Sequence, residues 1–336
     1  MELPILPTTV VGSYPRPAWL KRMLKLRRYG KVDEDQLLEA LDDAVVAAVR
    51  EQELAGIDIP SDGEQRRDEM VEYFAERIGG FKFYGPVRVW NNNFFNKPAV
   101  VSKLEYKQPI VLEEYFYLKR ISTRPIVKVT ITGPYTIADW SFNEYYETKE
   151  ELVRELSKII KAEISALADH GAVFIQIDEP ALTTHPNEVE WAIELIDEMA
   201  NGVNAKIALH VCYSDYNLLT PHVDRLKNIS QLVLEFANRG FRDLAMLRGF
   251  SKELGFGVVD VHSKRVEEPE EIARALRTAM EYVPPDMIYV NPDCGLKLLP
   301  RRVARAKLES MVAGVSLVRA ELRARGLETV PLRLRV

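Results

Sequence analysis

The chain has 336 residues, of which 47% are hydrophobic and 28% are charged, and its formal net charge is −5. This length exceeds that of an ordinary single domain but suits one large α/β barrel with insertions. The weak negative charge gives no argument for binding nucleic acid or an anionic membrane. No run of roughly 18 apolar residues predicts a membrane span, so we expect neither nucleic acid nor membrane as a partner.

The chain contains only two cysteines, Cys212 and Cys294. Two cysteines so far apart in the sequence do not form a disulfide framework. The first residues, 1–4, lack the charged and apolar regions of a signal peptide. We therefore expect a cytoplasmic protein whose thiols stay reduced and are free to bind a metal ion.

Taken in chain order, short apolar segments of strand type alternate with helical patterns. The first helical pattern, residues 33–54, begins at Asp33, a residue suited to the N-cap, and stops at Gly56. Residues 75–125 break the alternation with a segment rich in aromatic residues, Asn and Gly. The other helical patterns cover residues 149–170, 188–199, 268–282 and 301–325, and the strand candidates are residues 8–11, 57–59, 126–131, 173–177, 206–212, 232–235, 257–261 and 288–294.

Eight strand candidates that alternate with helices predict an α/β fold of the TIM (β/α)8 barrel type. We expect one catalytic barrel domain over residues 1–336, with a hairpin-like insertion after the second strand at about residues 75–125. The insertion is either a structural excursion or a lid or partner surface. Because active sites of such barrels lie at the C-terminal ends of the strands, polar residues at those ends are the candidate site residues.

Four of these polar residues are typical zinc ligands. His210 and Cys212 are two residues apart at the end of a strand candidate, so their side chains point to the same face. Glu235 ends the next candidate, and Cys294 ends the last one. Zinc takes four ligands of these types, although a packed His–Cys pair is the alternative. Glu235 could instead pair with Arg239, which would leave a position open for water or a substrate thiol.

Three further positions are candidate substrate anchors. Asp178 directly follows the strand candidate at residues 173–177, where a carboxylate suits a cationic substrate group or a structural ion pair. Glu64 could play the same part, but Arg66 and Arg67 are adjacent neutralising partners. Gly12 and Ser13, just after Val11, offer backbone N–H groups and a hydroxyl that suit a carboxylate, although such a turn is also ordinary.

Two other residues are candidates for chemistry and stacking. His262 follows a strand candidate and could act as a general acid near neutral pH, or it could be a hydrogen-bonded core histidine. Trp140 could be a stacking platform, or a packed aromatic.

Together these residues resemble the catalytic C-terminal half of cobalamin-independent methionine synthase. The resemblance rests on motifs spread in one order over almost the whole chain. They are residues 8–15, Gly63-Glu64, 68–74, Gly133-Pro134 with Trp140-Ser141, 175–182, 210–214, 260–263 and 290–297.

The resemblance implies a TIM barrel that holds Zn²⁺ through His210, Cys212, Glu235 and Cys294 and binds L-homocysteine with its sulfur on the zinc. It implies that Val11, Gly12 and Ser13 bind the substrate carboxylate and that Glu64 and Asp178 lie near its amino group. It also implies that His262 is a proton-relay residue and that Trp140 contacts the methyl donor.

Two departures concern the methyl donor. The full-length family has an additional N-terminal barrel that helps bind polyglutamyl folate, and the present sequence resembles only the other half. Where the family continues Asp-Glu-Pro-Ala-Leu with Arg-Glu, this chain has Thr183-Thr184. We therefore expect methionine synthesis from a methylated corrinoid (methylcobalamin or a corrinoid protein), with a methyltetrahydrofolate-type pterin as the second choice. The alternatives are methyl or alkyl transfer to another small thiol, and a non-catalytic barrel that binds zinc or a corrinoid protein.

Overall fold

The computed structural model describes residues 1–27, 29–88 and 94–334. Its main sheet has six strands in the order β10-β9-β8-β7-β6-β4. Strand β6 pairs with β7, and β9 pairs with β10, each in the parallel sense. Parallel strands covered on both faces are typical of α/β folds. The six strands are β4 (Val129–Thr132), β6 (Phe174–Asp178), β7 (Lys206–Val211), β8 (Gln231–Leu234), β9 (Glu253–Gly257) and β10 (Ile288–Asn291), and every residue in them is buried.

The first two strand candidates are reduced to isolated bridges. Thr8 pairs with Val290 and Thr9 pairs with Ile59, each in the parallel sense. The ladder stays short because the Asp58 carboxylate accepts the backbone N–H and the hydroxyl of Thr8, both at 2.8 Å. A carboxylate that occupies a ladder donor ends the regular strand pairing.

The seventh strand begins earlier in the chain than the predicted residues 257–261. The structure has β9 at Glu253–Gly257, so residues 258–261 follow the strand rather than form it. The start of β9 is not evident from the sequence, because Glu253 is charged and a charged residue normally lies at the surface. Here Glu253 is buried and lies 3.9 Å from Arg333. His262 therefore lies in a loop and not at the end of a strand.

The five predicted helices are present within a few residues of their predicted ends. Asp33 is the N-cap of the first of them and accepts a hydrogen bond from the backbone N–H of Gln36 (2.8 Å). The five are α2 (Glu34–Leu54), α6 (Lys149–Asp169), α7 (Val189–Met199), α8 (Pro269–Ala279) and α9 (Arg301–Arg323). The prediction missed α1 (Ala18–Arg27), α3 (Met70–Ala75), α4 (Leu112–Ile121) and α5 (Pro134–Asp139).

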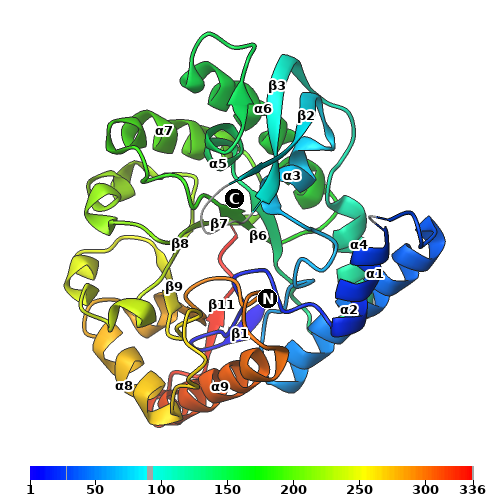
Figure 1. Ribbon diagram of the computed structural model, residues 1–336. Helices are drawn as coiled ribbons and strands as arrows, with labels where there is room; N and C mark the ends of the chain where they lie inside the picture. The colour runs from blue at the N-terminus through cyan, green and yellow to red at the C-terminus, as the bar shows by residue number, and fades with distance from the viewer. Residues whose placement is uncertain (28, 89–93, 335–336) are drawn as a thin grey trace. The chain divides into compact units, whose positions relative to one another are not determined.

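The segment predicted as an insertion contains an antiparallel strand pair, seen in cyan in Figure 1. The pair is β2 (Ile78–Arg88) and β3 (Phe94–Tyr106), and β5 (Phe142–Asn143) adds a short parallel strand to β3. Glu163 of α6 anchors the end of this segment by accepting the N–H groups of Ile110 (2.7 Å) and Val111 (2.8 Å). Residues 89–93 of the predicted insertion lie outside the described residues.

Contacts divide the chain into two compact units. The first consists of Met1–Arg66, Phe116–Val129 and Val233–Arg333, and it includes β9, β10, α2, α8 and α9. In it, β1 (Glu2–Pro4) pairs antiparallel with β11 (Thr329–Pro331). The second includes Arg67–Tyr115 and Thr130–Leu232, with β2, β3, β6, β7, α6 and α7. Among the described residues, no helix is both long enough and apolar enough to cross a membrane.

Candidate metal centre and substrate site

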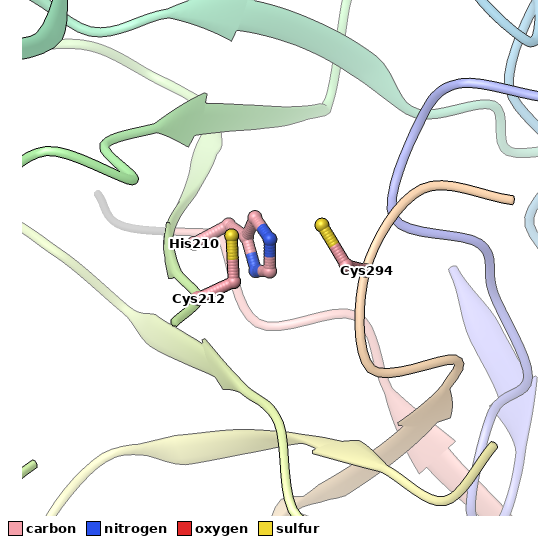
Figure 2. A group of neighbouring side chains, drawn as sticks. All are labelled: His210, Cys212 and Cys294. Carbon is pink, nitrogen blue, oxygen red and sulfur yellow. The ribbon is translucent and has the colours of Figure 1, made fainter. Parts of the chain in front are cut away.

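Three of the four predicted metal ligands lie next to one another. Figure 2 shows His210, Cys212 and Cys294 as neighbouring side chains, and their ligand atoms all lie within 4.8 Å of one another. His210 is the last residue but one of β7, and Cys212 is the first residue after that strand. Cys294 follows β10 by three positions. The neighbourhood thus consists of one imidazole and two thiols, with His210 and Cys212 buried and Cys294 half-buried.

This donor set fits a tetrahedral zinc ion. Both cysteines are free thiols. With Zn–S near 2.3 Å and Zn–N near 2.0 Å, two ligand atoms on a tetrahedral zinc lie about 3.5–3.8 Å apart. Separations below 4.8 Å meet that requirement after a small adjustment. Three protein ligands with room for a fourth are typical of zinc sites that admit a substrate.

Glu235, the fourth predicted ligand, falls outside this group among the residues that the structure describes. It is the first residue after β8, and only 2% of its surface is exposed. Arg239, its alternative partner in the sequence analysis, forms an ion pair with Asp243 (2.5 Å).

Asp293 is a buried carboxylate beside Cys294. It accepts the backbone N–H groups of Phe236 (3.0 Å), Ala237 (3.0 Å) and Asn238 (2.7 Å), which directly follow Glu235. Burial raises the pKa of Asp293 to about 7, and the three hydrogen bonds oppose that shift. Asp293 falls within the motif at residues 290–297, but its sequence position alone does not indicate a role.

The predicted carboxylate anchor lies beside the loop of Cys294. The backbone carbonyl of Ser13 accepts the N–H of Leu296 (2.7 Å). A Cβ atom added to Gly295 would lie 2.1 Å from Ser13 Oγ, so only glycine fits at position 295 without moving that hydroxyl. Val11 and Gly12 are buried, and the Gly12 carbonyl accepts the hydroxyl of Ser61 (3.3 Å).

This contact gives a prediction for Gly295→Ala. The new methyl group must push the Ser13 hydroxyl out of its place, because it would otherwise overlap Oγ. If Ser13 binds a substrate carboxylate, as the family resemblance implies, the KM for that substrate should rise by roughly tenfold, the effect of losing about one hydrogen bond to a charged group. Steady-state kinetics together with zinc content would check this. An unchanged KM with full zinc content would contradict the placement of the carboxylate at Ser13.

Glu64 lies in a tight turn beside the same segment. Its φ of +52° and that of Gly63 (+67°) are both left-handed. The turn is held by the Glu64 N–H, which donates to the Asp62 carboxylate (2.9 Å). The carbonyl of Gly63 accepts the N–H of Tyr14 (2.9 Å), which places this turn next to the one that contains Ser13. A non-glycine residue in this conformation is uncommon and often marks a functional turn.

The arginines adjacent to Glu64 have ion-pair partners of their own. Arg66 pairs with Asp42, and Arg67 pairs with Glu114 (3.2 Å).

Asp178 is the last residue of β6 and is 7% exposed. Its Oδ1 accepts a hydrogen bond from Gln176 Nε2 (2.7 Å). Its backbone carbonyl accepts the N–H of Gly133, at the start of α5 (2.9 Å). A neutral amide thus holds the carboxylate on one side.

Glu179, directly after β6, is a fully buried carboxylate that the sequence analysis did not assign. It accepts the N–H groups of Tyr135 (2.9 Å) and Thr136 (2.7 Å) and the hydroxyl of Thr136 (2.6 Å). Its own N–H donates to the carbonyl of His210 (2.9 Å). Burial raises its pKa to about 7, and these hydrogen bonds oppose the shift. Glu179 therefore connects the start of α5 to the segment that carries His210 and Cys212.

The remaining predicted residues lie on exposed or partly exposed segments. Trp140 is half-buried at the C-cap of α5. The side chain of His262 is 41% exposed, and its Nδ1 lies 3.2 Å from Asp260 Oδ1. His262 is therefore not the packed core histidine that was the alternative in the sequence analysis.

Thr183 is one of the two residues at which this chain departs from the family motif. Its hydroxyl donates to Ser214 Oγ (2.7 Å), and Ser214 donates to the carbonyl of Cys212 (2.9 Å). This chain of hydroxyls fixes the backbone directly after Cys212. Tyr213, between Cys212 and Ser214, has a left-handed φ of +55° and is 64% exposed.

Comparison with known proteins gives one consistent result. Residues 6–316 match the family model described as "Cobalamin-independent synthase, Catalytic domain". A curated methionine synthase of Thermococcus kodakarensis is 58% identical over 337 residues, which cover 100% of both chains. One of Pyrococcus horikoshii is 55% identical over 334 residues, which cover 99% of this chain and 98% of that one.

A solved structure agrees with these sequences. The B12-independent methionine synthase from Shewanella sp. W3-18-1, in complex with selenomethionine, has a TM-score of 0.83 and 28% sequence identity. The match covers 95% of this chain and 99% of that one. The predicted fold class, an α/β TIM barrel, is confirmed.

Proposed function

Because the chain belongs to the family of cobalamin-independent synthase catalytic domains, we propose that it is a methionine synthase that transfers a methyl group to the thiol of L-homocysteine. The observation that carries the proposal is the cluster of His210, Cys212 and Cys294 at the ends of β7 and β10. The names of the relatives, at 50–58% identity over almost the whole chain, support the same activity. The Shewanella enzyme binds selenomethionine, the selenium analogue of methionine, and this is consistent with methionine as the product.

We propose that His210, Cys212 and Cys294 hold zinc, with Glu235 as the fourth ligand. The zinc would keep a coordinated thiol deprotonated at neutral pH and so supply a thiolate nucleophile. In the transfer, the substrate sulfur forms a bond to the methyl carbon while the bond between methyl and donor breaks. Glu235 is buried directly after β8. A modest displacement of its side chain would decide whether Glu235 and the substrate share the zinc site.

We propose that the substrate is anchored through both of its charged groups. The turn at Val11, Gly12 and Ser13 would bind the carboxylate, and Glu64 and Asp178 would bind the ammonium group. The contact between Ser13 and Gly295, directly beside Cys294, supports the placement of the carboxylate. Anchors for an amino acid weigh against a rival substrate such as a small thiol with a sulfonate group, which would need basic residues there.

His262 and Trp140 complete the proposal on the donor side. The Asp260 carboxylate would orient the imidazole of His262, which suits a role as proton donor to the departing group. Trp140 ends α5, whose first turn is held by Glu179, so its ring would be placed by a rigid segment. We expect the protein to work in the cytoplasm, where both thiols stay reduced.

The choice of methyl donor follows from two opposing observations. The family description, "Cobalamin-independent", weighs against a methylated corrinoid and against a corrinoid-protein partner. Thr184 weighs against folate, because it stands where the family motif has the acidic folate contact, and its hydroxyl donates to the carbonyl of Ala181 (2.7 Å). The donor is therefore the variable that the experiment must resolve.

The test measures methionine formed by the purified, zinc-loaded protein from homocysteine, with either methylcobalamin or polyglutamyl methyltetrahydrofolate as donor. We expect methionine formation with one of the two donors. This activity should be lost when a chelator removes zinc and should return when zinc is restored. Turnover with folate would mean that Trp140 and its surroundings suffice for a pterin. No methionine from either donor, with zinc bound, would favour the non-catalytic alternative.

A further inference from the structure

One carboxylate joins the two loops that carry Glu235 and Cys294. Asp293 directly precedes Cys294, and its side chain reaches the loop after β8. There it accepts three consecutive backbone N–H groups, those of Phe236, Ala237 and Asn238, at 2.7–3.0 Å. The first of these donors is the residue next to Glu235. The backbones beside two proposed ligands, far apart in the sequence, are thus bound to a single side chain.

Both oxygens of Asp293 are used in this contact. Oδ1 accepts from Phe236 and Ala237, and Oδ2 accepts from Asn238. An ionised carboxylate can accept at every position, whereas an amide carries two donors on one side. An asparagine here would place an NH2 group against at least one backbone N–H. The arrangement therefore requires a carboxylate and not merely a polar side chain of the same shape.

The surroundings leave Asp293 no alternative position. The residue is 0% exposed, and its N–H donates to the carbonyl of Val259 (2.9 Å). A Cβ atom at Gly257 would lie 2.5 Å from Asp293 Oδ1 and 2.7 Å from the carbonyl oxygen of Leu234. The end of β9 thus needs glycine so that the carboxylate can reach the β8 loop.

From this geometry we infer that Asp293 is a positioning residue for the metal centre. It fixes the backbone at Glu235 relative to Cys294, so that the two side chains approach the same ion. The inference rests on the proposed zinc site. Asp293 itself is not proposed as a ligand, because its two oxygens are occupied by the three backbone donors.

The test is the variant Asp293→Asn. We expect its zinc dissociation constant, measured by competition with a chromogenic chelator, to rise about 10–100-fold, the usual result of losing a group that orients metal ligands. Substitution of Co²⁺ for zinc gives a second readout. The ligand-field bands should change, because a displaced Glu235 alters the geometry around the ion, whereas the thiolate charge-transfer band should persist.

Asp197→Asn is the matched control. Asp197 is another buried carboxylate that accepts the N–H groups of a loop, those of Asn228 (2.6 Å) and Ile229 (3.2 Å). That loop enters β8 at its N-terminal end, away from Glu235. This variant should lose stability in the same way and keep the zinc affinity and the cobalt spectrum of the wild type. The comparison separates a loss of folding from a loss of ligand placement.

The outcomes are distinguishable from a failure of the proposed function. Weak zinc binding and an altered cobalt spectrum in Asp293→Asn, but not in Asp197→Asn, would support the inference. Wild-type affinity and spectrum in a folded Asp293→Asn protein would overturn it. If that variant does not fold, Asp293→Ser decides in the same way, because it keeps an acceptor and removes the donor conflict. A wild-type protein that binds no zinc would instead refute the proposed metal centre.

Discussion

Replacement of Cys294 with serine should abolish zinc binding and methionine formation together. A serine hydroxyl stays protonated at neutral pH and is a poor zinc ligand, whereas a metal-bound cysteine is a thiolate. One of the three neighbouring ligand atoms would be lost. We expect zinc affinity to fall by more than about 100-fold, beyond the effect of losing a group that only orients a ligand. Zinc content after gel filtration and the rate of methionine formation measure the two effects.

Controls for this variant come from the chain itself. Cys212→Ser should give the same result, because both thiols belong to the group within 4.8 Å. His170→Gln replaces an exposed histidine whose Nδ1 lies 2.7 Å from the carbonyl of Ala166, and it should keep full zinc content and activity. Stoichiometric zinc in a folded Cys294→Ser protein would show that the ion binds elsewhere.

The sequence predicted this cluster because its signal is local. The alternation of side chains along β7 puts His210 and Cys212 on one side, and the apolar segments before Cys212 and Cys294 end where the buried strands end. Helix boundaries were predictable for the same reason. Asp33 and the apolar spacing after it define the start of α2 without reference to any other part of the chain.

The residues that support the cluster could not be found in this way. Glu179 and Asp293 are acidic residues in short motifs, and nothing local separates them from a ligand or from a surface charge. Their roles arise from donors about 44 and 57 positions away in the sequence, at Tyr135 and Phe236. The misplacement of β9 has a similar origin, since buried Glu253 lies near Arg333, which is far away in the sequence. Contacts that form on folding leave no periodic pattern.

The two buried carboxylates show how this fold holds a polar site at the ends of apolar strands. Each is fully buried, each accepts three hydrogen bonds, and burial raises the pKa of each to about 7. A buried charge is costly unless several donors compensate it. Five of the six donors are backbone N–H groups, in the first turn of α5 and in the loop after β8, and the sixth is the hydroxyl of Thr136, so each carboxylate and the segment that it holds stabilise one another. The loops that carry the proposed ligands are thereby fixed without a metal ion.

Gly133→Ala should be among the most destabilising single-methyl changes in this protein. A Cβ atom at position 133 would lie 2.2 Å from both Cδ and Oε1 of Glu179. Glu179 cannot move aside, because it is fully buried and holds Tyr135 and Thr136 by three hydrogen bonds. Overpacking costs about 1–3 kcal/mol, and each buried donor left without its acceptor costs about 1–3 kcal/mol more. We expect the free energy of unfolding to fall by roughly 3–5 kcal/mol, measured by urea denaturation.

Two further variants assign this loss to the clash with Glu179. Gly202→Ala adds the same methyl group where nothing lies within 4 Å, so it should cost only the left-handed strain of its φ of +81°, about 1–2 kcal/mol. Glu179→Ala removes the clashing atoms, but it leaves the hydrogen-bond donors of Tyr135 and Thr136 without their acceptor. This variant should therefore also be destabilising. Because the obstacle is then gone, adding Gly133→Ala to Glu179→Ala should cost almost nothing more. If the two losses instead add, Gly133 acts through its backbone, and the contact with Glu179 does not explain why glycine is needed there.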